Sequence, residues 1–263
     1  AMKMVSAAKL KKAQDAITAM RPYSEKLTEL IQSLSASLEG DVAANYTTQR
    51  EVKKVLVVAI TSNRGLCGAL NNNVIKQVRV LTDIYGHDNI GVFAIGKKAN
   101  DGLHKSNYVI ANRSDIYDDL TFDNVAEIAQ SLTHLFLDGE YDKIELVYNQ
   151  FVNAATQNVV NEQFLPLAPI KGGNAISSDY IFEPSKEEIV LELIPKSLKT
   201  QLYKAVRDSF AAEHGARMTA MHKATDNATD LRNQLKLTYN KARQAAITGE
   251  ILEIVGGAEA LNN

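Results

Sequence analysis

Hydrophobic side chains recur in alternating steps of three and four along the first part of the chain. They are Leu10, Ala13, Ile17, Met20, Leu27, Ile31, Leu34 and Leu38, with Ser24 at the one polar position of the series. This spacing is typical of a helix that packs lengthwise against another helix. We therefore predict one helix that ends at Gly40 and that kinks or loosens at Pro22, because proline removes a backbone hydrogen bond from a helix interior.

A second long helix is predicted at the other end of the chain. Ser185 followed by Glu188 fits the capping-box pattern that starts a helix, and Pro195 fits an early turn or a kink. No further proline occurs, and Gly256 is the predicted stop. Gly249 lies inside this helix and should weaken it by about 1 kcal/mol relative to alanine. The spaced seam positions are Met221, Ala224, Ala228, Leu231, Leu235, Thr238, Ala242, Ala245 and Leu252.

The two helices are complementary in length and in side-chain size. At about 1.5 Å of rise per residue, the first helix would be about 60 Å long, more than a compact core of this size covers. Small residues on the late helix let two backbones approach, and the larger Leu and Ile side chains of the first helix fill the gaps. We therefore predict an antiparallel coiled coil between 1–40 and 185–263. The alternative is that both helices pack separately on the central domain as ordinary surface helices.

Between the helices, short apolar runs alternate with amphipathic stretches. The predicted strands are 55–60, 91–95 and 144–148, with an edge strand at 158–165. The predicted helices are 69–85, 97–104 and 122–137, the last capped by Thr121 or Asp123. This alternation indicates right-handed βαβ crossovers and a mostly parallel sheet. The predicted fold class is thus α/β, an antiparallel coiled coil of the N- and C-terminal helices with a central Rossmann-like α/β domain over 52–170.

Composition narrows the functional classes. The 263 residues are 45% hydrophobic and 23% charged, which favours a folded globular protein over a disordered or fibrous one. The net charge of −2 argues against nucleic acid as the default partner. The sequence has no apolar run of the roughly 18–20 residues that a spanning helix needs, so we expect no direct membrane insertion.

Two glycine-containing segments invite comparison with nucleotide-binding loops. From Gly91 to Lys97 the spacing is that of a phosphate-binding loop, but Lys98 stands where Ser or Thr should bind Mg²⁺. The intervening residues are a predicted strand, whose N–H groups belong to the sheet. The segment TSNRGLCG at 61–68 follows a strand and opens a helix, where anions often bind. It lacks the third glycine of the dinucleotide fingerprint, so we prefer a tight turn that requires glycine.

Other catalytic chemistry has little support in the sequence. The five histidines show neither metal-ligand spacing nor a neighbouring nucleophile motif, so we expect no catalytic residues, no metal site and no cofactor. Cys67 is the only cysteine, which excludes an internal disulfide. We interpret it as a small buried residue, with a reactive thiol at a helix N-terminus as the alternative.

Basic residues are concentrated on the two helices. Residues 1–26 contain six Lys or Arg against two acidic residues, and residues 217–243 again contain six against two. In an antiparallel pair, parts of both segments would share one region, which would suit acidic loops on a partner. The alternative from charge alone is an ordinary solvated helix face.

Four segments resemble the γ subunits of rotary F-type ATP synthases. They are AMKMVSAAKL at 1–10, TSNRGLCG at 61–68, ARMTAM through ATDNA at 216–228, and YNKARQAAITGEI at 239–251. The resemblance covers essentially the whole chain, with the motifs in the family's order. It implies a central-stalk rotor that transmits rotation between a proton-driven c-ring and the catalytic β subunits during ATP synthesis or hydrolysis. It also implies that the chain is a non-catalytic subunit.

The same resemblance implies partners and contact residues. The partners are the α and β subunits of the catalytic hexamer, an ε or equivalent subunit, and the membrane c-ring. Met2 and Arg217 would face an acidic loop of β. The contacts implied with the loops that hold the upper stalk are Arg243, Gln244, Thr248 and Glu250. Tyr180 would lie at the base, against ε or the c-ring.

Further expectations concern the setting of the chain. The family carries residues before Ala1, so we expect the tip of the late helix to be unpaired and mobile here. A single cysteine cannot form the dithiol switch of the chloroplast relatives. The expected location is peripheral, on the cytoplasmic side of the bacterial inner membrane, with the mitochondrial matrix side as the alternative. The alternative function is a coiled-coil adaptor with an α/β nucleotide-binding or interaction domain.

Overall fold

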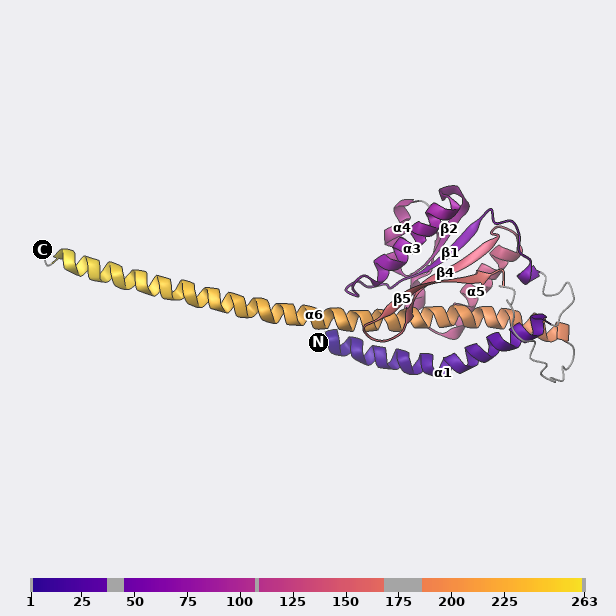
Figure 1. The fold of residues 1–263 in the computed structure, drawn as a ribbon, viewed down its shortest axis with the longest axis horizontal. Helices are drawn as coiled ribbons and strands as arrows, with labels where there is room; N and C mark the ends of the chain where they lie inside the picture. The colour runs from indigo at the N-terminus through magenta and orange to yellow at the C-terminus, as the bar shows by residue number, and fades with distance from the viewer. Residues whose placement is uncertain (1, 37–44, 107–108, 168–185, 262–263) are drawn as a thin grey trace. The chain divides into compact units, whose positions relative to one another are not determined.

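The computed structural model describes residues 2–36, 45–106, 109–167 and 186–261, and the chain divides into two compact units, Ala1–Thr219 and Ala220–Asn263. The helices in Figure 1 are α1 (Met2–Ala36), α3 (Leu70–Tyr85), α4 (Lys97–Leu103), α5 (Phe122–Leu137) and α6 (Lys186–Leu261). The strands are β1 (Val55–Ile60), β2 (Ile90–Ile95), β3 (Val109–Asn112), β4 (Lys143–Phe151) and β5 (Gln157–Leu165). Helix α6 contributes residues to both units.

The strands form one sheet in the order β3-β2-β1-β4-β5. β1 is parallel to β2 and β4, β2 is parallel to β3, and β5 is antiparallel to β4 at the edge. The four strands predicted from the sequence are confirmed. β3 was not predicted, because its four side chains alternate between half-buried and exposed and form no continuous apolar run.

β1 is buried on both faces, and its alternate residues belong to two hydrophobic cores. The odd-numbered residues Val55, Val57 and Ala59 pack with α3 and α4. The even-numbered residues pack with α5 and with the first part of α6 on the other face. Thr121 caps α5 by accepting a hydrogen bond from Asn124 N, as predicted. Helices on both faces of a mostly parallel sheet confirm the Rossmann-like arrangement.

The predicted stripe on α1 is buried. Its buried members are Leu10, Ala13, Ile17, Ser24, Leu27 and Ile31, each at most 8% exposed. The first three share a cluster with Ala211 and Ala212 of α6 and with Phe151 of β4. Small alanine side chains let the two helix backbones approach closely. The predicted end at Gly40, together with Leu38, lies outside the described residues.

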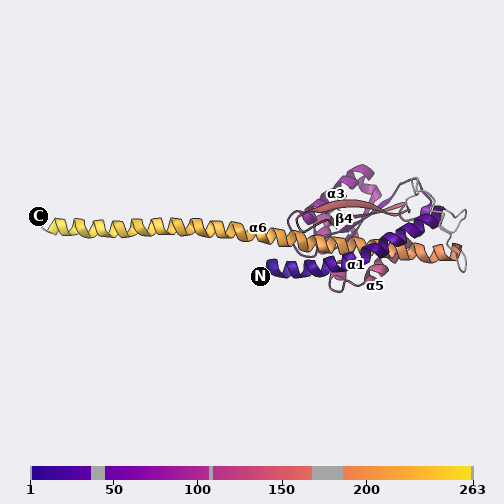
Figure 2. The ribbon, with the colours of Figure 1, turned by 60° about the horizontal axis from the view of Figure 1, so that its bottom comes forward.

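The two helices run in opposite directions, side by side in Figures 1 and 2. Lys9 of α1 lines the same hollow as His214 of α6, whereas Arg21, later in α1, lies 3.8 Å from Asp208, earlier in α6. Residue numbers therefore rise along α1 as they fall along α6, and the antiparallel arrangement of the terminal helices is confirmed. α1 bends along its length, as expected for a helix with Pro22 in its interior.

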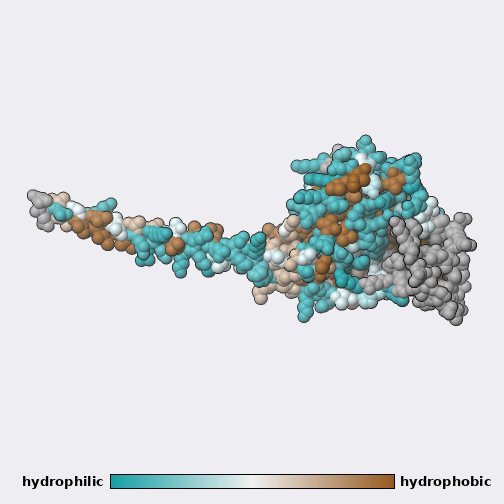
Figure 3. All heavy atoms as spheres, in the orientation of Figure 1, coloured by the Kyte–Doolittle hydropathy of each residue, from teal (hydrophilic) through white to brown (hydrophobic). Residues whose placement is uncertain are grey.

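The second unit is helical throughout its described residues. Its large apolar side chains lie at the surface, where Figure 3 shows hydrophobic groups among polar ones. They are Leu231, Leu235, Leu237, Tyr239, Ile247, Ile251, Leu252, Ile254 and Val255, from 43% to 71% exposed. The second unit therefore does not bury the apolar side chains of the seam predicted over 221–252.

Among the described residues, no helix combines the length with the apolar character that crossing a bilayer requires.

Asp208 and His214 of α6 are buried titratable groups in the first unit. The Asp208 side chain is 1% exposed, and within the described residues neither carboxylate oxygen has a hydrogen-bond partner. Burial raises the pKa of Asp208 to about 6, although the positive charges of Arg21 and Lys204 oppose the shift. Burial also lowers the pKa of His214 to about 4, and the positive charge of Arg217 adds to that shift.

These shifts predict opposite effects of pH on the free energy of unfolding. The folded-state pKa of Asp208 lies above its usual 3.8, so its favourable contribution is present below about pH 3.8 and is lost as pH rises towards 6. Asp208→Asn should therefore stabilise the chain more at pH 8 than at pH 4, by about 2–3 kcal/mol. Urea unfolding across this range measures the difference, and a pH-independent difference would contradict the prediction.

His214 provides the matched control. Its folded-state pKa lies below the usual 6.5, so its contribution is present above pH 6.5 and is lost as pH falls towards 4. His214→Gln should flatten the acid side of the stability curve, in contrast to Asp208→Asn.

Gly249 can be tested in the full chain. A β-carbon at Gly249 would meet nothing within 4 Å, so Gly249→Ala should stabilise the surrounding helix by about 1 kcal/mol. Slower hydrogen exchange of the amides around 245–253 is the expected result. Gly256→Ala, which is equally unhindered but nearer the helix end, should have a smaller effect; equal or faster exchange in Gly249→Ala would be inconsistent with this account.

Candidate functional site

The loop after β1 occupies the N-terminus of α4. The first N–H groups of a helix have no intrahelical partners, and in many α/β proteins they bind phosphate. Here Lys97 N donates to Asn63 Oδ1 at 2.9 Å. Ala99 N donates to Thr61 Oγ1 at 2.7 Å. The chain thus supplies its own acceptors for two of the first N–H donors of α4.

Further hydrogen bonds within the chain fix the loop after β1. Tyr117 donates to the Thr61 carbonyl at 2.8 Å, and Asn63 Nδ2 donates to the Ser114 carbonyl at 2.8 Å. A β-carbon at Gly96, where φ is 104°, would collide with the Thr61 carbonyl. The segment that begins at Gly91 lies in β2 and pairs with β1 and β3, which confirms its interpretation as a strand.

The turn at 65–68 has unusual backbone geometry. Gly68 has a φ of 63°, which confirms the predicted tight turn. Leu66 has the same φ, a left-handed conformation that costs a residue with a β-carbon about 1–2 kcal/mol. Cys67 is 1% exposed, and its Sγ lies 3.2 Å from Asn71 Nδ2, so its interpretation as a small buried residue is confirmed.

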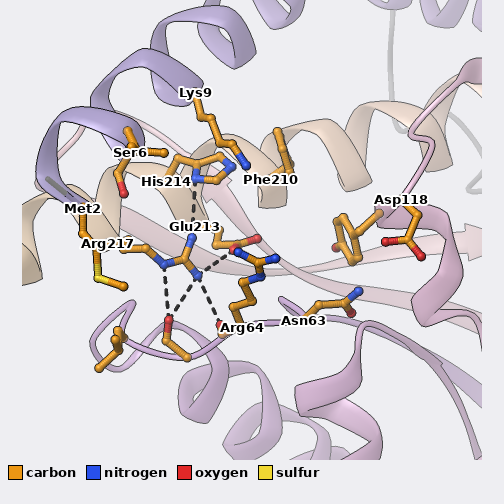
Figure 4. A pocket seen from close by; sticks show the side chains of 14 residues that line it. Met2, Ser6, Lys9, Asn63, Arg64, Asp118, Phe210, Glu213, His214 and Arg217 are labelled. Carbon is orange, nitrogen blue, oxygen red and sulfur yellow. Dashed lines mark hydrogen bonds and ion pairs between the residues drawn. The ribbon is translucent and has the colours of Figure 1, made fainter.

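A hollow of about 430 Å³ lies between this turn, the start of α1 and the stretch of α6 around 210–217. We call it the α1–α6 hollow, and Figure 4 shows its side chains. It is lined by Met2, Val5, Ser6, Lys9, Asn63, Arg64, Gly65, Leu66, Tyr117, Asp118, Phe210, Glu213, His214 and Arg217. The structure therefore brings together Met2 and Arg217, which lie near opposite ends of the first unit in sequence.

The Arg217 guanidinium is largely engaged within the chain (Figure 4). Its Nη2 lies 2.6 Å from Glu213 Oε1, in an ion pair whose side chains are 12% and 9% exposed. Its Nε and Nη2 also donate to the Gly65 carbonyl at 3.2 and 3.1 Å, and Nη2 donates to the Arg64 carbonyl at 3.2 Å. Arg217 thus ties α6 to the loop after β1.

Two exposed cations remain at the hollow. Burial raises the pKa of Glu213, while the positive charges of Arg217, Lys9 and Arg64 oppose the shift. Arg217 is paired, but Lys9 and Arg64 have exposed side chains. Sequence reasoning counted Lys9 among the basic residues of the first helix but selected neither Lys9 nor Arg64 as a contact residue, although both lie in the motifs at 1–10 and 61–68. Their relevance depends on the fold, which brings them to one place.

The hollow also has an apolar rim. Met2 is 59%, Val5 57% and Leu66 63% exposed, which is high for large hydrophobic side chains. Exposed apolar groups beside cations suit a protein segment that carries both apolar and acidic side chains.

The other predicted contact residues do not lie at this hollow. Arg243, Gln244, Thr248 and Glu250 are exposed on α6 in the second unit. Gln244 and Thr248 are four residues apart and share one face of the helix. Tyr180 lies outside the described residues.

Comparison with known proteins gives a consistent result. A family model described as ATP synthase matches residues 1–261. The chain is 76% identical to the ATP synthase gamma chain of Flavobacterium johnsoniae, over 100% of this chain and 92% of that protein. It is 49% identical to the ATP synthase gamma chain of Cytophaga hutchinsonii, again over 100% of this chain and 92% of that protein.

Solved structures share the fold. A chain from the central stalk and c-ring of the Tetrahymena thermophila mitochondrial ATP synthase matches with a TM-score of 0.66 at 24% identity, covering 85% of this chain and 97% of that one. A chain from the Euglena gracilis mitochondrial ATP synthase matches with a TM-score of 0.63 at 21% identity, covering 98% and 94%. With the full-length sequence matches, these findings lead to one assignment: the chain belongs to the ATP synthase γ-chain family, the central-stalk subunits of F-type ATP synthases.

Proposed function

We propose that this chain turns inside a hexamer of α and β subunits and couples rotation of the membrane c-ring to catalysis on β. The observation that carries the proposal is 76% identity to a γ chain across the whole of this chain. The antiparallel pairing of α1 with α6 suits this role, because two packed helices resist bending and twisting better than one.

The chain acts in this proposal without catalysing a reaction itself. Support comes from the α4 N-terminus, whose donors are bound by Thr61 and Asn63 and are therefore not free for a phosphate. An asymmetric shaft stabilises different β conformations at different angles, so that rotation becomes a sequence of changes in nucleotide affinity. The free energy for coupling then comes from differences in contact between the shaft and each β subunit.

Three sets of contacts are proposed. Met2 and Arg217 lie toward an acidic loop of β, and the exposed cations Lys9 and Arg64 at the same hollow favour such a partner. The upper loops of the hexamer contact Arg243, Gln244, Thr248 and Glu250, which are exposed. Tyr180 contacts ε or the c-ring at the base.

A γ chain is a peripheral part of a membrane ATP synthase. We place this one on the cytoplasmic side of a bacterial inner membrane, with the mitochondrial matrix side as the alternative. The identities of 76% and 49% to two bacterial γ chains favour the bacterial location.

Reconstitution tests the rotor function directly. The full chain should form a stable complex with α and β subunits on gel filtration and should stimulate their ATP hydrolysis several-fold. The chain alone should not hydrolyse ATP. A coiled-coil adaptor for an unrelated partner, the alternative function, would show no preference for the hexamer. Failure to form the complex or to stimulate ATP hydrolysis would therefore overturn the proposal.

The second-unit contacts are tested by replacing Arg243 and Gln244 together with Ala. Alanine keeps the helix, so the effect should come from lost contacts with the hexamer. We expect ATP synthesis by the reconstituted complex to fall roughly tenfold, about 1.4 kcal/mol. Lys236→Ala, exposed on the same helix, is the control and should have little effect. Unaltered synthesis in the double variant would refute this assignment.

A further inference from the structure

Asp208 of α6 carries a carboxylate that the fold buries without hydrogen-bond donors. Its side chain is 1% exposed, and within the described residues neither oxygen has a hydrogen-bond partner. Nearly all buried polar groups of folded proteins are hydrogen-bonded, so an exception requires an explanation. An ionised carboxylate in such a place loses its hydration and is stabilised only by nearby charges.

Charged and titratable groups reach Asp208 from α1, α6, β4 and β5. Arg21 on α1 lies 3.8 Å from Asp208 Oδ1, and Lys204 lies one turn earlier on α6. Both positive charges favour the ionised form, whereas Glu162 on β5 opposes it. Tyr148 on β4 donates to Glu162 at 2.8 Å and stays neutral, because burial raises its pKa. For Asp208, burial outweighs the two cations and raises the pKa to about 6.

A polar hollow of about 360 Å³ lies beside this carboxylate. We call it the Arg21 hollow; it is lined by Arg21 and Ser24 of α1, by 150–152 at the end of β4, and by Lys204 and Asp208 of α6. A water molecule takes up about 30 Å³ in the liquid, so the hollow has room for several.

Arg21 is weakly held at the edge of this hollow. Its side chain is 47% exposed, its Nη2 donates to the Phe151 carbonyl at 3.4 Å, and its ion pair with Asp208 is long at 3.8 Å. Hydrogen bonds and ion pairs of this length are weak. Displacing the Arg21 side chain therefore costs little and exposes the Asp208 carboxylate to the water of the hollow.

The backbone at this point is also the easiest part of α1 to open. Pro22 lacks the N–H that would bond to the carbonyl four residues earlier, and α1 bends along its length (Figure 1). Before the proline, Leu10, Ala13 and Ile17 are held by apolar packing with α6. The turn at 21–24 can thus open while the first half of α1 stays packed.

We propose that Asp208 is a proton-sensitive switch of the α1–α6 pair. Its protonated form keeps α1 closed on α6, and its ionised form admits water to the Arg21 hollow and loosens α1 around Arg21 and Pro22. This inference goes beyond the proposed function and does not depend on it, since it concerns the chain by itself.

Linkage fixes the direction of the effect. A proton favours the conformation that binds it more tightly. The closed conformation has the higher pKa at Asp208, about 6, whereas a hydrated aspartate has the usual 3.8. The closed conformation is therefore most favoured below about pH 3.8, loses this advantage as pH rises to 6, and changes little above pH 7.

Hydrogen exchange of the full chain measures the opening. Protection factors of the amides at 23–27, which are corrected for the intrinsic effect of pH on exchange, should fall roughly tenfold between pH 5 and 7 and stay level from pH 7 to 8. This opening should depend little on added urea, unlike exchange of the β1 amides at 57–59. If the amides at 23–27 exchange only by the same urea-dependent unfolding as β1, the local switch is overturned.

Asp208→Asn removes the titrating group and keeps its shape. Protection at 23–27 should then be the same at pH 5 and pH 7. Asp15→Asn, which neutralises an exposed carboxylate on α1, is the matched control and should keep the wild-type pH dependence. A tenfold pH effect that persists in Asp208→Asn would assign the switch to another group and refute the proposal.

Arg21→Gln tests the switch from the α1 side. Because the charge of Arg21 favours ionised Asp208, its removal should raise the pKa of Asp208 and move the fall in protection to higher pH. Carboxyl ¹³C NMR follows this pKa directly, with Lys12→Gln, exposed on α1, as the control that should leave it unchanged. A midpoint near the usual 3.8 in the unmodified chain, or no shift in Arg21→Gln, would overturn the proposal.

Discussion

In the first unit, α6 is held from two sides along successive turns. Ile194, Leu198 and Leu202 are buried in the core beneath the sheet, and further along Ala211 and Ala212 are buried with α1. Burying one large aliphatic side chain contributes about 1.5–3 kcal/mol to stability. Sliding or rotating α6 would expose several of these side chains to water at once, and their contributions would be lost together. The fixed position of α6 therefore also fixes the positions of those of its side chains that face α1 and the loop after β1.

The polar residues of α6 depend on this placement. Asp208, Glu213 and His214 are each less than 10% exposed, although unpaired buried charges destabilise a folded protein. Glu213 is compensated by Arg217, but Asp208 has only a distant ion pair with Arg21. The packing of α1 against α6 thus keeps these two carboxylates away from water, which would otherwise solvate their charge. Such groups can specify one register of two helices, because a shifted register would leave them without their partners.

Much of the fold follows from local patterns in the sequence. The buried stripe of α1, including Ser24, could be identified because its spacing is purely helical. β3 could not, since a four-residue strand with alternating exposure resembles a loop. Met2 and Arg217 were selected by resemblance to a family. Lys9 was counted only as one of the basic residues of the first helix. Arg64 and Leu66 were missed, because their surroundings depend on contacts across some 150 residues and on a backbone angle that no side-chain pattern encodes.

The hydrogen bonds between the loop after β1 and the start of α4 have a thermodynamic consequence. A domain that binds a nucleotide in its native state becomes more stable as the nucleotide concentration rises, by an amount that depends on the ratio of concentration to dissociation constant. Here Thr61 and Asn63 already bind the first donors of α4 as permanent parts of the chain. The stability that these two bonds contribute therefore does not depend on the concentration of any nucleotide.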